Sequence, residues 1–238
     1  MASKKYFLVL DTETCNSVEE PIPYDIGWAI CDKKGNIYER RSYIVAETFC
    51  DMQDVMVSAY YAEKIPMYWE DLKTGKRKLQ QMWNIRKAML SDMKKYKVSA
   101  VCAYNMGFDR TALNNLIRYV SKSWARYWFP FGTEYICIWN MACNHILNRT
   151  TYINFAEKNG FISQKNNLLT SAECAYRYIT DSLDFVESHT GLEDVEIEVE
   201  IMVECFRQKK ALKKEINPGC WKVVQNKRRE VHSKKRVA

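Results

Sequence analysis

Residues 6–13 of the chain, YFLVLDTE, join a short apolar run to two acidic residues. A run of this length with aromatic and β-branched members is typical of a central strand that is buried on both faces. Side chains two residues apart share one face of a strand, so Asp11 and Glu13 point the same way from its end. Their mutual repulsion is costly unless a cation lies between them. The alternative is an acidic turn after a strand, because Asp-x-Glu is a common sequence.

The segments around this run predict one α/β domain built on a mixed sheet. Apolar runs predict four further strands, at Ile26–Cys31, Ile37–Val45, Val98–Tyr104 and Glu134–Trp139. Helical spacing predicts helices within residues 46–96, from about Asp109, near Met141–Leu147, over about Thr170–Thr180 and from Gly191 to about Leu212. The first three strands follow one another through short turns, which indicates a meander. The prediction is a mixed five-stranded sheet flanked by helices.

Two apolar faces support the helical prediction for residues 46–96. One has Phe49, Met52, Met56 and Tyr60 at helical spacing, and the other begins at Leu79. The segment also holds a basic loop at 73–78 and several aromatic residues, namely Tyr60, Tyr61, Tyr68, Trp69 and Trp83. Aromatic rings beside basic groups suit a wall that binds single-stranded nucleic acid. Packing in the core is the alternative for each ring.

Basic residues gather at the C-terminal end of the chain. The formal net charge is +7, with 47% hydrophobic and 27% charged residues, a composition that excludes bulk disorder. Residues 207–238 contain 12 Lys or Arg and 2 acids, whereas the other 206 residues hold 24 basic and 27 acidic ones. A basic tail on a near-neutral body often meets a polyanion. The alternative is a solvated tail that aids solubility.

The cysteine pattern predicts free thiols and a cytoplasmic protein. Nine cysteines are an odd number, none forms a CxxC pair, and none of the three histidines has zinc-finger spacing to a cysteine pair. The apolar run before Asp11 is too short for a signal peptide, and no stretch of 18 apolar residues predicts a membrane span.

A third carboxylate is expected at the same edge of the sheet. Asn105-Met-Gly-Phe-Asp109 links the fourth predicted strand to a helix. Asp109 occupies the expected N-cap of that helix, so one interpretation is that its side chain only caps the helix. The functional interpretation is a ligand at the carboxyl ends of the strands, where α/β proteins place their sites.

The last predicted helix carries a fourth carboxylate. Thr190 and Glu193 have capping-box spacing, which predicts a helix that starts at Gly191. At 100° per residue, Asp194 and Glu198 fall on the apolar face, whereas a solvated face holds Glu193, Glu196, Glu200 and Glu204. A buried carboxylate needs a partner.

His189 precedes the same helix end, so it can share a site with Asp194. The structural alternative is that His189 lies near the C-terminus of the preceding helix, where the helix dipole favours a positively charged side chain. Together the expected site holds one histidine and four carboxylates, from Asp11, Glu13, Asp109 and Asp194. Oxygen ligands without a thiolate suit Mg²⁺ or Mn²⁺. Two such ions about 3.5–4 Å apart form the usual clamp for phosphodiester hydrolysis.

These motifs resemble those of the DEDDh exonucleases, the DnaQ-like proofreading branch of the ribonuclease H-like superfamily. The three matching motifs are Asp11-Thr-Glu13-Thr14, Asn105-x-x-Phe108-Asp109 and His189-x-x-x-x-Asp194. The y branch would have Tyr at position 190, where this chain has Thr. The resemblance covers about residues 5–210. Two departures are the long segment 46–96 and Gly191, where Ala is usual.

The resemblance implies a 3′–5′ exonuclease that releases nucleoside 5′-monophosphates from single-stranded DNA or RNA ends. The four carboxylates would hold two Mg²⁺ or Mn²⁺ ions, and His189 would act as general base on a metal-bound water. Thr14, Asn105 and Phe108 would contact the terminal nucleotide, although packing under the helix is the alternative for Phe108. The angular position of Glu198 suggests support for the metal site.

The expected organisation is an exonuclease domain over residues 1–212, with 46–96 as a helical inserted segment, and a basic C-terminal tail over 213–238. Two other functions stay open, a ribonuclease H-like endonuclease and a non-catalytic nucleic-acid-binding protein. The sequence also leaves open whether DNA or RNA is the preferred substrate, and whether a polymerase or another replication protein is a partner. No membrane partner is expected.

Overall fold

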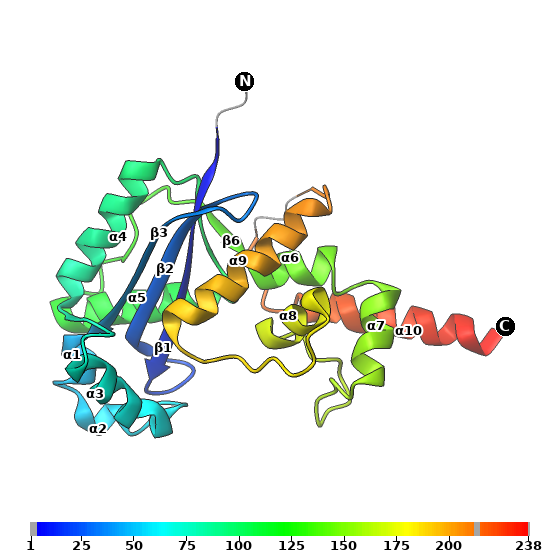
Figure 1. The fold of residues 1–238 in the computed structure, drawn as a ribbon, viewed down its shortest axis with the longest axis horizontal. Coiled ribbons are helices and arrows are strands. Elements are labelled where there is room, and N and C mark those ends of the chain that lie inside the picture. Colours follow the sequence, from blue (N-terminus) through cyan, green and yellow to red (C-terminus); the bar gives the residue numbers. More distant parts are fainter. Residues whose placement is uncertain (1–3, 212–214, 238) are drawn as a thin grey trace.

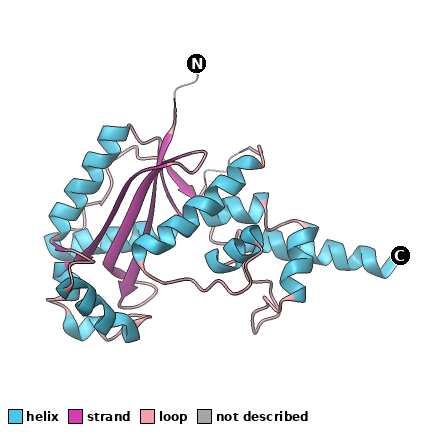
Figure 2. Ribbon diagram, viewed as in Figure 1, coloured by secondary structure: helices cyan, strands magenta, loops and turns pink. Residues whose placement is uncertain are grey.

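A six-stranded mixed sheet forms the centre of the molecule (Figure 2). The computed structural model describes residues 4–211 and 215–237. The strands are β1 (Tyr6–Cys15), β2 (Ile22–Asp32), β3 (Ile37–Val45), β4 (Leu79–Gln80), β5 (Ala100–Ala103) and β6 (Tyr135–Cys137). Their order across the sheet is β4-β3-β2-β1-β5-β6, with β1 to β3 as an antiparallel meander and β5 and β6 parallel to β1.

The predicted α/β class and mixed sheet are confirmed, and each of the five predicted strands is present. The last of them is shorter than the predicted Glu134–Trp139, because α6 begins at Ile138. The predicted strand number is wrong by one, because β4 adds a short edge strand that pairs in parallel with Ile44 and Val45. Leu79 belongs to this strand and not to the following helix, which begins at Met82. Two residues are too few to show the alternation that marks a strand.

Helices cover both faces of the sheet (Figure 1). One face carries α4 (Met82–Tyr96) and α5 (Met106–Ser121). On the other face α9 (Gly191–Arg207) packs against β1 and β2, and α6 (Ile138–His145) packs against β5. Three further helices pack on these helices or on one another rather than on the sheet, namely α7 (Thr150–Lys158), α8 (Ala172–Thr180) and α10 (Trp221–Val237). Alternate side chains of β1 enter the two resulting cores, with Phe7 and Val9 in one and Leu8 and Leu10 in the other. β1 is therefore buried on both faces, as predicted.

The segment 46–96 is helical but broken into short pieces. It contains α1 (Ala46–Phe49), α2 (Gln53–Met56), the 3₁₀ turn η1 (Ala62–Lys64) and α3 (Ile65–Lys73) before α4. Phe49, Met52 and Met56 are buried, whereas Tyr60 is 84% exposed. The prediction of one continuous face that includes Tyr60 is therefore wrong, because the chain leaves the helical path after Met56.

The C-terminal segment, expected as a basic tail, contains helix α10. Cys220, Val224 and Val231 belong to the core cluster that also contains Phe7 and Val9, and α10 packs against α6 and α7. The side-chain amide of Gln225 accepts a hydrogen bond from the Leu168 amide at 3.0 Å and donates one to its carbonyl at 3.1 Å. Helix α9 ends at Arg207, before the predicted end near residue 212. That end and the predicted domain boundary at 212–213 lie outside the described residues.

All nine cysteines are free thiols, and eight of them are buried. Among the helices in the described part of the chain, none has both the length and the apolar composition that crossing a membrane requires.

Candidate active site

The predicted carboxylates meet where β1 ends and where α5 and α9 begin (Figure 1). Asp11 and Glu13 come from β1, Asp109 from the first turn of α5 and Asp194 from the first turn of α9. Glu13, Asp109 and Asp194 are buried. Because parallel strands end at one edge of the sheet, segments that are far apart in the chain reach a single place.

Burial and mutual repulsion raise the pKa values of these carboxyl groups. For Asp11, burial is the largest cause and the charges of Asp109, Glu13 and Asp194 add to it, so its pKa lies well above the ordinary value. Burial also raises the pKa of Glu13 to about 8, of Asp109 to about 7 and of Asp194 to about 6. A divalent cation among them would relieve this repulsion.

Three predicted ligands lie close together. Glu13, His189 and Asp194 each present a ligand atom within 4.8 Å of the other two. Asp11 and Asp109 are outside this group, and the Asp109 carboxylate accepts a hydrogen bond from the Thr12 hydroxyl at 2.9 Å. The structure therefore places three of the five predicted site residues in direct reach of one ion, with the other two beside them.

Asp194 is held by the chain that leads into α9. The Thr190 amide donates to Asp194 Oδ2 at 3.1 Å, and the Ser188 hydroxyl donates to Oδ1 at 3.0 Å. Helix α9 begins at Gly191, as predicted. The predicted capping box is wrong in its bonding, because the Thr190 hydroxyl donates to the Glu193 carboxylate at 2.8 Å and makes no bond to a helix amide.

The start of α9 lies against β2, backbone to backbone. A Cβ on Gly27 would lie 2.3 Å from the Gly191 carbonyl carbon, and one on Gly191 would lie 2.8 Å from the Gly27 nitrogen. Gly27 is also the strand partner of Asp11. No side chain fits this contact, which gives a physical reason for glycine at position 191. The two glycines set the distance between the β1 carboxylates and Asp194.

A buried ion-pair network that sequence reasoning missed supports this contact. The Asp25 carboxylate accepts hydrogen bonds from the Gly191 amide at 3.2 Å and from Arg77 Nη1 at 3.2 Å. Arg77 also pairs with Asp71 at 3.0 Å and with Glu193 at 3.1 Å. Asp25, an acidic residue within a mostly apolar strand, was the feature of the sequence that could have indicated a buried partner.

Two residues expected in the substrate wall are therefore structural. Arg77, from the predicted basic loop, is only 6% exposed and belongs to this network. Tyr68 is fully buried, and its hydroxyl donates to the Asp25 carboxylate at 3.0 Å. The packing alternative holds for Tyr68, whereas Trp69 and Trp83 keep about two fifths of their surface exposed.

His189 stands at the rim of the site in a left-handed conformation, with φ +48°. Its ring stacks on Tyr61, with centroids 4.1 Å apart and planes at 15°. Nδ1 faces the Glu187 carboxylate at 4.0 Å. Burial, and then the charge of Lys64, lowers the pKa of His189, so the imidazole is neutral and able to accept a proton at neutral pH.

Glu187 is a site residue that sequence reasoning missed. With Glu173 and His189 it forms a second group of ligand atoms within 4.8 Å of one another. Burial is the largest cause that raises its pKa to about 7, followed by the charges of Asp194 and Glu173. It lies in a loop without periodicity, so no pattern marked it.

The predicted substrate residues lie next to the carboxylates in the chain, at the end of β1 and the start of α5. Thr14 lies at an irregularity in the pairing of β1 with β2 and is half-buried. Asn105 is the exposed N-cap of α5, and its carbonyl accepts from the Phe108 amide at 2.8 Å. Phe108 is half-buried. The expected N-cap at Asp109 is wrong, because α5 begins three residues earlier and places Asp109 in its first turn.

Glu198 lies one turn after Asp194 and is 3% exposed. Its Oε2 is buried with no hydrogen-bond partner among the described residues. Burial, followed by the charge of Asp109, raises its pKa well above the ordinary value. An orphaned buried carboxylate oxygen beside Asp11 and Asp109 fits a site completed by a cation or its bound water. The donor set, carboxylates with one imidazole, suits Mg²⁺ or Mn²⁺.

The fold is similar to that of solved exonucleases. A zinc-bound complex of Escherichia coli exonuclease I with single-stranded DNA matches with a TM-score of 0.52 and 12% identity, over 87% of this chain and 41% of that one. E. coli exonuclease I with a 5cy-dT13 oligonucleotide matches with a TM-score of 0.52 and 11% identity, over 94% of this chain and 43% of that one. Exonuclease X in complex with 5′ overhanging duplex DNA has a TM-score of 0.46 and 14% identity, over 90% of this chain and 99% of that one.

This chain spans less than half the length of those exonuclease I chains. The sequence matches no protein-family model and no curated protein. At these identities the likeness shows the fold, and the chain shares the ribonuclease H-like fold of the matched part of E. coli exonuclease I.

Proposed function

We propose that the chain is a metal-dependent 3′–5′ exonuclease that hydrolyses phosphodiester bonds at single-stranded DNA or RNA ends and releases nucleoside 5′-monophosphates. The convergence of Glu13, His189 and Asp194 within 4.8 Å, beside Asp11 and Asp109, carries the proposal. The names of the structural neighbours, which are exonucleases with bound DNA, agree with it.

Each group has a separate role in this reaction. Asp11, Glu13, Asp109 and Asp194 would hold two Mg²⁺ or Mn²⁺ ions, which would supply a water of lowered pKa and neutralise charge on the phosphate. The neutral imidazole of His189 takes the proton of the attacking water at Nε2, because Nδ1 faces Glu187.

The Glu187 carboxylate then stabilises the imidazolium that forms, as an acidic partner does for a catalytic histidine. Glu198, whose buried Oε2 has no hydrogen-bond partner among the described residues, would support the ions. Thr14, Asn105 and Phe108 contact the terminal nucleotide, since they border the carboxylates at the edge of the sheet.

Product analysis tests the proposal. DNA and RNA oligonucleotides, single- and double-stranded and labelled at either end, are incubated with Mg²⁺ or Mn²⁺. We expect mononucleotides released from the 3′ end and an uncut circular single strand. Cleavage of the circle would indicate the endonuclease alternative. If no metal-dependent hydrolysis of any linear substrate occurs, the exonuclease proposal fails and a non-catalytic binding protein remains.

A further inference from the structure

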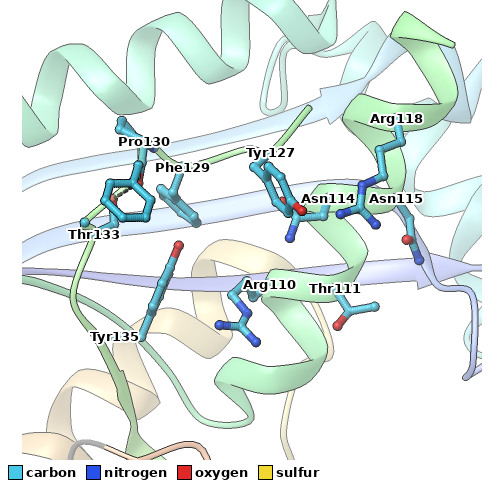
Figure 3. A pocket seen from close by; sticks show the side chains of 12 residues that line it. Arg110, Thr111, Asn114, Asn115, Arg118, Tyr127, Phe129, Pro130, Thr133 and Tyr135 are labelled. Carbon is cyan, nitrogen blue, oxygen red and sulfur yellow. Dashed lines mark hydrogen bonds between the residues drawn. The ribbon is translucent and has the colours of Figure 1, made fainter. Parts of the chain in front are cut away.

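A groove follows the outer side of α5. One hollow of about 530 Å³ lies between the α5 residues Arg110, Asn114 and Arg118 on one side and Tyr127 of the following loop and Tyr135 of β6 on the other (Figure 3). A second hollow of about 350 Å³ shares Arg118 and continues to further residues, which are Asn16, Tyr119, Lys122 and Trp124. We call the two hollows together the α5 groove.

Large aromatic side chains stand unusually exposed along this groove. Phe131 is fully exposed, Trp124 is 82% exposed, Tyr127 is 58% exposed and Tyr119 is 44% exposed. All four lie within 13 consecutive residues, from the last turns of α5 into the loop that leads to β6. Rings held in water without packing are typical of a surface that binds a partner.

Cations alternate with the rings. The Arg110 guanidinium lies 5.3 Å from the centre of the Tyr135 ring, and Arg118 lies 4.9 Å from that of Tyr127. Lys122 Nζ lies 4.1 Å from the centre of the Tyr119 ring. Glu20, in the second hollow, is the one acidic residue among those that line the two hollows. This mixture of flat rings and positive charge complements bases and phosphates.

Each hollow of the α5 groove has one lining residue that adjoins the candidate active site in the chain. Arg110 follows Asp109 in the chain, and Asn16 follows directly on β1, which carries Asp11 and Glu13. From Arg110 to Ser121 the helix is about 16 Å long at 1.5 Å per residue. At 3.4 Å or more per nucleotide this length holds up to about five nucleotides of one strand.

We propose that the α5 groove binds the single-stranded part of the nucleic acid that precedes the 3′ end held in the site. Bases stack on Trp124, Tyr127 and Phe131, and phosphates pair with Arg110, Arg118 and Lys122. The assignment of the bound strand as substrate rests on the proposed exonuclease function. The affinity of the groove for single strands rests on the groove alone.

Binding is measured first, with EDTA present so that no strand is hydrolysed. The probes are fluorescent oligothymidylate and oligouridylate, each of 3 and of 16 nucleotides. Trp124→Ala and Phe131→Ala should each weaken binding of the longer probes by about tenfold, because each removes one stacking platform. Trp124→Phe and Phe131→Tyr keep a ring and should bind like the unaltered protein. These exposed side chains contribute little to the core, and a thermal melt of each variant verifies folding.

Charge is tested with a matched pair. Arg118→Gln should lower the slope of log affinity against log salt by about 0.7 for a single strand. Lys94→Gln removes an exposed charge from the last turn of α4, outside the residues that line the groove, and should leave the slope unchanged. With Mg²⁺, hydrolysis of a 3-nucleotide substrate should be unaffected by the ring variants, whereas KM for the 16-nucleotide substrate should rise with kcat unchanged.

The outcomes separate the two proposals. If the alanine variants bind the 16-nucleotide probes as well as the unaltered protein does, the groove proposal is overturned. It is also overturned if the unaltered protein binds no single strand, which would leave the exposed rings to a protein partner. Binding that depends on the rings without any hydrolysis would support the groove and contradict the exonuclease function.

Discussion

The imidazole of His189 stacks on the phenol ring of Tyr61, with centroids 4.1 Å apart and planes 15° from parallel. The two residues come from segments 128 positions apart, η1 with its preceding turn and the loop before α9. Lys64, in η1, donates a hydrogen bond to the Ser188 carbonyl and lies over the same phenol ring. Tyr61 and Lys64 therefore position the proposed general base.

Removing the Tyr61 ring should lower the rate of hydrolysis. Tyr61→Ala leaves the imidazole without its stacking partner, and we expect kcat to fall by about tenfold or more with a small change in KM. Tyr61→Phe keeps the stacked ring and should retain most of the activity. Steady-state kinetics on a short single-stranded substrate measures both variants. Equal kcat for Tyr61→Ala and the unaltered protein would show that the stack does not position His189.

Replacing the proposed base or the α9 carboxylate should nearly abolish hydrolysis. His189→Ala is expected to cost about 10²- to 10⁴-fold in kcat, because the water loses its proton acceptor. Asp194→Asn keeps the shape of the side chain but removes the charge that an ion requires. Nucleotide release from an end-labelled strand measures both, and circular dichroism verifies the fold. Full activity in either variant would contradict the assigned roles.

The buried carboxylates should make the metal-free protein less stable as pH rises. Unfolded carboxyl groups lose their protons near pH 4, whereas the pKa values of Asp194, Asp109 and Glu13 are raised to about 6, 7 and 8. Between pH 4 and 8 the folded state binds more protons than the unfolded state, so the free energy of unfolding falls.

Thermal melts in EDTA at pH 5 and pH 8 measure this loss. We expect a lower Tm at pH 8, a smaller difference in Glu13→Gln, and recovery at pH 8 when Mg²⁺ or Mn²⁺ is added, because a cation binds the ionised carboxylates of the folded state. A Tm at pH 8 that the ions do not raise would argue against a metal site at this edge.

Breaking the network around Asp25 should destabilise the whole domain. Arg77→Ala leaves the fully buried Asp25 without its cation, which costs about 3–5 kcal/mol in other buried pairs. The neighbouring Lys76 pairs with Asp71 at 3.3 Å, but its side chain is 61% exposed. Lys76→Ala should therefore change the free energy of unfolding by less than about 1 kcal/mol. Denaturant unfolding compares the two, and equal losses would show that Arg77 is not structural.

The contact between β2 and α9 should tolerate no larger residue. Gly191→Ala places a methyl group 2.8 Å from the Gly27 nitrogen, and we expect a loss of about 1–3 kcal/mol together with weaker metal binding. Gly27→Ala, with a closest approach of 2.3 Å, should cost more. Unfolding and metal titration of both variants test this order. A stable Gly191→Ala protein with normal metal affinity would show that the backbones adjust freely.

Local patterns predicted the main strands and the site motifs because each depends on nearby residues. The apolar run before Asp11 and the apolar face around Asp194 are such patterns, and both are buried as expected. Glu187 and Arg77 lie in loops, where no period relates a residue to its distant partners. Their roles depend on the tertiary fold, which brings Arg77 to Asp25 across 52 positions.

Helix α10, in the basic C-terminal segment, was not among the predicted helices. A run of Lys and Arg predicted a tail, because charge count outweighed the three apolar residues Cys220, Val224 and Val231 that face the core. The α5 groove was also missed, since its rings lie in a loop and their exposure is known only from the structure.

The contact of Gly191 with Gly27 determines when the candidate site can assemble during translation. A ribosome that has synthesised 180 residues has produced all six strands and three of the four carboxylates, but neither His189 nor Asp194. The nuclease proposed above would therefore be inert throughout most of its own translation. Hydrolysis would begin only after α9 has emerged and packed on β2, so an incomplete chain would not hydrolyse the nucleic acids around it.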